Sequence, residues 1–136
     1  MTELEELERD YQAGKFAAIL SDLLQFVRNH RDKIVQFRDR MSAGKGGAIA
    51  DDLALKMYIM QIRSINPAEE IKSQLAEIER EIWIRGEHLG REPDRKVVAR
   101  EWCDRHAPGW RDHRVMAIVY VVDRHREELI SILRSS

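Results

Sequence analysis

The sequence predicts an all-α protein: a compact bundle of about five to six helices, with a long C-terminal helix over about residues 110–134 as a central element. Apolar residues recur at steps of three and four along most of the chain, which is the spacing of one face of a helix. Helix-starting signatures precede several of these stretches. Only seven glycines and three prolines interrupt the 136 residues, so few positions favour turns.

Length and charge set the first limits. A chain of 136 residues is near the commonest domain size, so we expect residues 1–136 to form a single helical domain. Charged residues make up 35% of the chain, but 24 acidic and 23 basic groups leave a net charge of −1. No strong overall field therefore attracts nucleic acid or an anionic membrane, and any such binding requires a local patch.

The expected location is the cytoplasm, with no membrane segment. A single cysteine forms no internal disulfide, and the acidic start "MTELEELERD" lacks the apolar core of a secretion signal. The longest apolar run, residues 115–122, has eight residues where a membrane-spanning helix needs about 20.

The first helix is predicted from a capping box. Thr2 is followed three residues later by Glu5, a pattern in which each side chain satisfies a free backbone N–H. We expect this helix to end near Gly14, because glycine adopts the left-handed conformation that commonly follows a helix.

Residues 16–37 have apolar positions at helical spacing, interrupted by the polar stretch "RNHRDK". Two alternatives follow: one long helix, or two helices with a break near Asn29 and His30. Residues 42–50, "SAGKGGAIA", contain three of the seven glycines and are predicted to form a flexible loop.

A central helix and an amphipathic helix are expected next. Asp51 or Asp52 is a candidate cap for a helix through residues 53–65, which are apolar on most of the circumference. Asn66 and Pro67 are typical of an N-cap and a first helical position. The helix that they start repeats apolar residues at alternating steps of four and three, a seam for another helix of this chain or of a second copy: Ile71, Leu75, Ile78 and Ile82.

The C-terminal half is predicted to contain two more helices. Gly86 and Gly90 are expected to close the preceding helix, and Asp94 to begin the next one. Pro108 should stop that helix. The β-branched run at 115–122 is predicted to be helical, since no second run is available to pair with it as a strand.

No complete catalytic, phosphate-binding or metal-binding motif is present. Cys103 and His106 lie three apart, with His113 beyond, but structural zinc usually takes four ligands. These three are weak metal candidates, and a half-buried thiol beside polar residues is the plainer interpretation. We therefore expect no metal, no cofactor and no catalytic residue, and the sequence favours a protein that is not an enzyme.

Residues 102–114, "WCDRHAPGWRDHR", combine two tryptophans with three arginines. Trp102 follows Val98 by four residues and is expected in the core, and Trp110 brackets the turn. Tryptophan and arginine are also enriched at interaction hot spots. The favoured hypothesis is a non-catalytic subunit or adaptor that binds a protein partner, or a second copy of itself, through helix faces and this corner, with these candidate residues: Arg105, Trp110, Arg111 and Arg114.

The alternative hypothesis is a small helical nucleic-acid-binding module, such as a subunit of a ribonucleoprotein complex. Residues 91–126 contain nine lysines and arginines against six acids, and arginines neutralise phosphates. Asp104 and Asp112 offer local partners that would cancel this excess. The candidate nucleic-acid contacts are Arg95, Lys96, Arg100, Arg105, Arg111, Arg114, Arg124 and Arg126.

Overall fold

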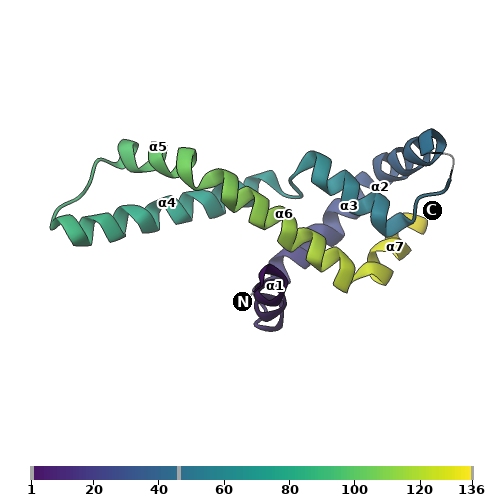
Figure 1. The fold of residues 1–136 in the computed structure, drawn as a ribbon, viewed down its shortest axis with the longest axis horizontal. Coiled ribbons are helices and arrows are strands. Elements are labelled where there is room, and N and C mark those ends of the chain that lie inside the picture. The colour runs from purple at the N-terminus through teal and green to yellow at the C-terminus, as the bar shows by residue number, and fades with distance from the viewer. Residues whose placement is uncertain (1, 46, 136) are drawn as a thin grey trace. The chain divides into compact units, whose positions relative to one another are not determined.

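The computed structural model describes residues 2–45 and 47–135, and every regular element in these ranges is a helix, as the sequence predicts. The described residues contain seven helices rather than five to six (Figure 1). In chain order they are α1 (Glu3–Gln12), α2 (Ala17–Lys45), α3 (Asp51–Ile62), α4 (Pro67–Leu89), α5 (Arg95–Arg105), α6 (Ala107–Arg124) and α7 (Arg126–Arg134).

Contacts divide the chain into two compact units. Unit 1 comprises Met1–Ile65 and Val115–Ser136, and unit 2 comprises Asn66–Arg114. Helix α6 contributes residues 107–114 to unit 2 and its remainder to unit 1. The expectation that residues 1–136 form one domain stays a prediction.

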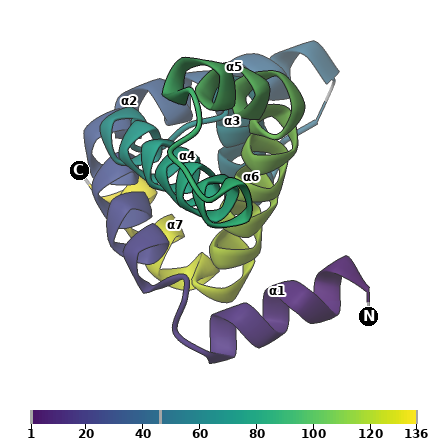
Figure 2. The ribbon, with the colours of Figure 1, turned by 90° about the vertical axis from the view of Figure 1, so that its left-hand side faces the viewer.

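Helix α1 begins as its sequence predicts. The Thr2 hydroxyl accepts a hydrogen bond from the backbone N–H of Glu5 at 3.2 Å. After the helix ends, Gly14 adopts φ of 78°, a conformation that a residue with a Cβ rarely takes. The chain turns sharply there, between α1 and α2 (Figure 2).

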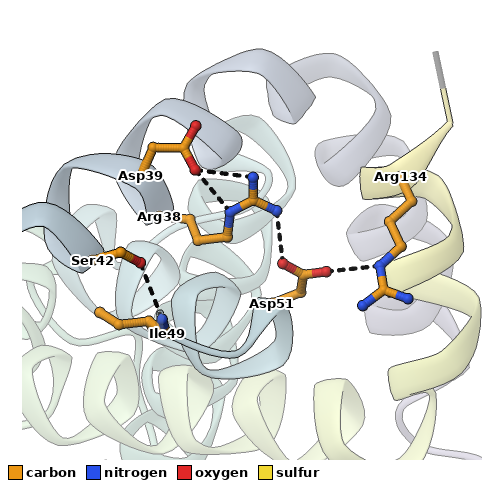
Figure 3. Close-up of polar contacts among 6 residues, drawn as sticks. All are labelled: Arg38, Asp39, Ser42, Ile49, Asp51 and Arg134. Carbon is orange, nitrogen blue, oxygen red and sulfur yellow. Dashed lines mark hydrogen bonds and ion pairs between the residues drawn. The ribbon is translucent and has the colours of Figure 1, made fainter. Parts of the chain in front are cut away.

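Helix α2 resolves the first alternative, because it runs unbroken through Asn29 and His30. It also continues to Lys45, so the predicted loop boundary at residue 42 is wrong. Residue 46 lies outside the described residues, and residues 47–50 contain no helix. The Ser42 hydroxyl accepts a hydrogen bond from the backbone N–H of Ile49 at 3.0 Å, which links the last part of α2 to the segment before α3 (Figure 3).

Neither Asp51 nor Asp52 is the N-cap of α3, so that prediction is wrong. The cap is Ala50, which makes no side-chain hydrogen bond, and Asp51 is the first helical residue. The Asp51 carboxylate instead accepts hydrogen bonds from Arg38 at 2.8 Å and from Arg134 at 3.0 Å (Figure 3). The Asp51 carboxylate thus connects α3 to both α2 and α7.

The core of unit 1 lies among α2, α3, α7 and the second part of α6. Helix α7 packs on both α2 and α3, and α2 packs on α3. The most deeply buried large side chains of this unit are Leu23, Val27, Ile34, Leu55, Ile59, Ile118, Val121, Val122 and Leu129. The run at 115–122 is helical, as predicted from the lack of a pairing strand, and it contributes three of these side chains, Ile118, Val121 and Val122.

The predicted long C-terminal helix is wrong. Helix α6 ends at Arg124, and α7 begins at Arg126 after His125, whose φ and ψ are −124° and 29° (Figure 1). Leu129 and Leu133 of α7 are buried in the core of unit 1. No glycine or proline marks this break, which is therefore set by tertiary packing rather than by local preference.

Unit 2 is built on the antiparallel pair α4 and α5, which lie side by side (Figure 1). Asn66 caps α4 with its side chain, and Asp94 caps α5 in the same way, both as predicted. Gly90, with φ of 70°, ends α4, whereas Gly86 lies inside the helix, contrary to expectation.

The predicted stop at Pro108 is displaced. Helix α5 ends at Arg105, and α6 already begins at Ala107, so Pro108 lies in the first turn of α6. A first turn tolerates proline because its N–H groups have no partner within the helix. His106 alone separates the two helices, and its carbonyl accepts the first α6 hydrogen bond, from Trp110.

Candidate functional site

The Trp/Arg corner, residues 102–114, belongs to unit 2. Trp102 is 6% exposed and packs in a small core with Val98 and Ile82, as its sequence position predicts. Trp110 is half-buried against the same cluster. Both indoles therefore contribute first of all to the packing of the unit 2 core.

The three candidate arginines of the corner differ in their surroundings. Arg105 and Arg111 are exposed. Arg114 is mostly buried, and its Nε lies 3.5 Å from Oε1 of Glu70, a carboxylate that is itself only 7% exposed. Arg114 thus holds a buried charge in unit 2, and its side chain is less accessible than those of Arg105 and Arg111.

A pocket of about 330 Å³ opens beside the two tryptophans. It is lined by residues of α4, α5 and α6 and by His106 between the last two helices: Glu77, Arg80, Glu81, Ile84, Trp102, His106 and Trp110. Of the four predicted partner-binding residues, Trp110 lines this pocket, whereas Arg105, Arg111 and Arg114 do not.

The predicted nucleic-acid contacts are divided between the units. Arg124 and Arg126 belong to unit 1, and the other six belong to unit 2. Four of the eight already interact within the chain. Arg95 pairs with Glu79 and Glu92, Arg114 with Glu70, Arg126 with Asp52, and Arg124 lies 4.7 Å from the centre of the Tyr11 ring.

The other four cations differ in their lack of an ion pair rather than in exposure, because Arg95, Arg124 and Arg126 are exposed as well. Lys96, Arg100, Arg105 and Arg111 are exposed and make no ion pair with the described residues. These four are the candidate contacts without an ion pair, and, after Arg85, the Arg105 charge also lowers the pKa of the Glu101 carboxyl.

The weak metal candidates are not assembled into a site. Cys103 is an exposed free thiol, not the half-buried one expected, and His106 and His113 are exposed as well. Among residues 2–45 and 47–135, no three His, Cys, Asp or Glu side chains come together in an arrangement that would hold a metal ion.

The structure shows an exposed aromatic residue that the sequence reasoning missed. Trp83, on α4, is 66% exposed, the largest exposed fraction of any large apolar side chain of the described residues. It follows Ile82 of the apolar seam by one residue, so it is rotated by about 100° from the core-facing side of the helix. A tryptophan one step off an apolar seam is the signal that would have identified it.

The seam on α4 is only partly used within unit 2. Ile78 and Ile82 are buried against α5. Ile71 and Leu75, at the beginning of the same seam, are exposed. One half of the predicted packing surface is therefore internal, and the other half is accessible.

Trp83 borders a second cavity of about 410 Å³, at the end of unit 2 where α4 turns into α5. We call this cavity the Trp83 groove. Its lining combines the indole with glycines and charged side chains: Glu79, Ile82, Trp83, Gly86, Glu87, Gly90, Arg91, Glu92 and Arg95.

Ion pairs hold α4 and α5 together beside this groove. Arg85 donates to Glu101 of α5 at 2.7 Å and to Glu81 at 3.1 Å. The hydrogen bond from Arg85 lowers the pKa of the Glu101 carboxyl, and the same bond raises the pKa of Arg85. Arg95 of α5 pairs with Glu79 of α4. Both pairs are partly exposed and favour this pairing of the helices modestly.

Unit 1 contains a polar chain of its own at the break between α6 and α7. The Tyr11 hydroxyl lies 2.7 Å from Nε2 of His125, and Nδ1 of His125 lies 3.0 Å from the Glu128 carboxylate. These contacts connect α1 to the start of α7. Sequence reasoning missed them because Tyr11 and His125 are 114 positions apart.

None of the described helices is long and apolar enough to span a bilayer. Neither family models nor curated proteins nor solved structures match this chain.

Proposed function

We propose that the chain is a non-catalytic interaction protein, a subunit or adaptor that binds a protein partner through unit 2. The observation that carries the proposal is the exposure of Trp83 on α4. A tryptophan in this state leaves a large apolar surface in water, and tryptophan is among the residues most enriched at interaction hot spots. Ile71 and Leu75 add accessible apolar surface on the same helix.

The Trp/Arg corner has a secondary place in this proposal. Arg105 and Arg111 are accessible and Trp110 is half-buried, so these three suit the rim of an interface. Arg114 is assigned to the internal ion pair with Glu70 instead.

Nucleic-acid binding remains the alternative proposal, on the strength of the four exposed cations described above. Against it, the most exposed indole lies on α4, which carries six acidic residues against Lys72, Arg80 and Arg85. A negatively charged helix repels phosphates. Trp102, which lies nearer to these cations in sequence, is buried and offers no free face to a base.

Affinity capture from the native cell extract tests the proposal. Wild-type protein and Trp83→Ala are compared, each with and without nuclease treatment. Leu4→Ala is the matched control, because Leu4 is an equally exposed apolar residue of α1 in unit 1.

We expect protein partners that survive nuclease, are retained by Leu4→Ala and are lost or strongly reduced with Trp83→Ala. Partners held equally by Trp83→Ala would contradict the role of Trp83. Material that disappears on nuclease treatment would support the nucleic-acid alternative.

A further inference from the structure

The Trp83 groove differs from a plain apolar patch in its pattern of charge. Glu79, Trp83 and Glu87 lie at i, i+4 and i+8 on α4, so they form one row along the helix surface with the indole between two carboxylates. All three line the same cavity of about 410 Å³. Gly86 and Gly90 also line it, and the space beside Gly90 is open, because a Cβ there would meet no atom within 4 Å.

The two carboxylates have capacity for a ligand. Glu87 is exposed and makes no ion pair with the described residues. Glu79 uses Oε1 for Arg95, and an ionised carboxylate accepts about four hydrogen bonds, so its other positions remain available. No lysine or arginine of the described residues stacks on the Trp83 ring.

The chemistry of this row favours a cation. The face of an indole carries the negative part of the ring quadrupole, and tryptophan is the strongest cation–π partner among the side chains. The groove has three carboxylates against Arg91 and Arg95, and Arg95 is already paired with Glu79 and Glu92. The formal charge of the side chains that line the groove is therefore −1, which favours a cationic ligand.

We propose that the Trp83 groove binds an arginine side chain of the protein partner, with the guanidinium on the indole and between Glu79 and Glu87. This inference rests on the proposed function, because it names the chemistry of the partner. Arginine suits the site better than lysine, since its planar group stacks on an aromatic ring while donating to carboxylates in its own plane.

The test uses the full-length protein and three synthetic pentapeptides as probes. They are acetyl-Ala-Ala-Arg-Ala-Ala-amide, the same peptide with citrulline, and the same peptide with glutamate. Citrulline retains the planar shape of arginine without its charge. The readout is the NMR signal of the indole N–H of Trp83, assigned by its loss in Trp83→Phe, and the initial slope of its shift with peptide concentration.

We expect the slope for the arginine peptide to exceed that for the citrulline peptide by at least about threefold. Glu87→Gln should reduce the arginine slope by roughly two- to fivefold, and added salt should reduce it further. Glu69→Gln is the matched control, because it removes the same charge from α4 at an exposed position outside the groove. It should leave the slope nearly unchanged.

Equal slopes for arginine and citrulline, or a larger slope for glutamate, would overturn the inference. So would equal effects of Glu87→Gln and Glu69→Gln. These failures are distinguishable from failure of the proposed function. If the protein captures its partner through Trp83 but does not distinguish arginine from citrulline, the proposed function stands and the inference of an arginine ligand fails.

Discussion

Trp83 and Trp102, both in unit 2, have opposite relations to its core: Trp102 is 6% exposed and Trp83 is 66% exposed. They are the same residue type on neighbouring helices. Trp102 buries nearly all of its apolar area on folding, whereas most of Trp83 stays in water. We therefore expect Trp102 to determine the stability of the fold and Trp83 to determine the binding of a partner.

Alanine substitution should reveal this difference. Trp102→Ala removes a buried side chain and leaves a cavity, and we expect a loss of about 3–5 kcal/mol in the free energy of unfolding. Trp83→Ala should change it by no more than about 0.5 kcal/mol, because the side chain is largely in water already. Urea unfolding followed by circular dichroism measures both. Similar losses for the two variants would show that Trp83 is part of the core.

Arg111 and Arg114 should also differ in their contributions to stability. Arg114→Ala removes one partner of the buried Glu70 carboxylate and should destabilise the protein by about 1–3 kcal/mol. Arg111 is exposed, so Arg111→Ala should leave stability within about 0.5 kcal/mol of wild type. Thermal unfolding of the two single variants decides this. A larger loss for Arg111→Ala would contradict the assigned roles.

The Asp51 network predicts a dependence of stability on acid. Hydrogen bonds from Arg38, and then from Arg134, lower the pKa of the Asp51 carboxyl in the folded state. A lowered folded pKa contributes stability above the unfolded value of about 3.9, and that stability is lost as pH falls through the folded pKa. As the pH is lowered from 6 into the acid range, the urea concentration at the midpoint of unfolding should therefore fall less steeply for Asp51→Asn than for wild type. Parallel curves would rule out this contribution.

The two arginines bound to Asp51 should contribute unequally. The Asp51 side chain is 8% exposed, that of Arg38 is half-buried, and that of Arg134 is 72% exposed. Arg134→Ala should cost no more than about 1 kcal/mol, as surface ion pairs do. Arg38→Ala should cost about 1.5–3 kcal/mol, because it removes the more buried charged hydrogen bond. The order of the two losses in urea unfolding is the check, and the reverse order would contradict it.

Tyr11→Phe tests the attachment of α1. The substitution removes the hydroxyl that lies 2.7 Å from His125 while keeping the ring, which packs on Tyr120. We expect a loss of about 0.5–1.5 kcal/mol. Hydrogen exchange of the α1 amides should accelerate more than that of α2, because local opening releases the helix from that contact. Uniform acceleration would indicate that α1 is held by other contacts.

Local signals predicted much of the fold. Thr2, Asn66 and Asp94 cap helices as their positions predict, because an N-cap depends only on a side chain and the backbone that follows it. The break at His125 could not be predicted, since the packing of α7 on α2 and α3 determines it. The prediction that Pro108 stops α5 is wrong, because Pro108 lies in the first turn of α6. Proline is compatible both with the end of one helix and with the first turn of the next, so the sequence alone does not distinguish the two positions.

The candidate site was predicted only in part. The spacing of Trp102 to Val98 predicts its burial, and the position of Trp83, one residue after Ile82 of the apolar seam, agrees with its exposure. Periodicity alone does not show that Trp83 borders a groove, because Arg91, Glu92 and Arg95 come to it from beyond the end of α4. Arg114 is less accessible than Arg111 because it pairs with Glu70, which lies more than 40 positions away in sequence, so this difference could not be predicted either.

Site-specific photo-cross-linking in the native extract tests the central claim most directly. A benzoylphenylalanine side chain replaces Trp83 in one protein and the equally exposed Leu4 in a control protein. We expect a cross-linked protein partner from position 83, resistant to nuclease, and none from position 4. Cross-links of equal yield from both positions, or none from position 83 while the protein is bound in a complex, would contradict the claim.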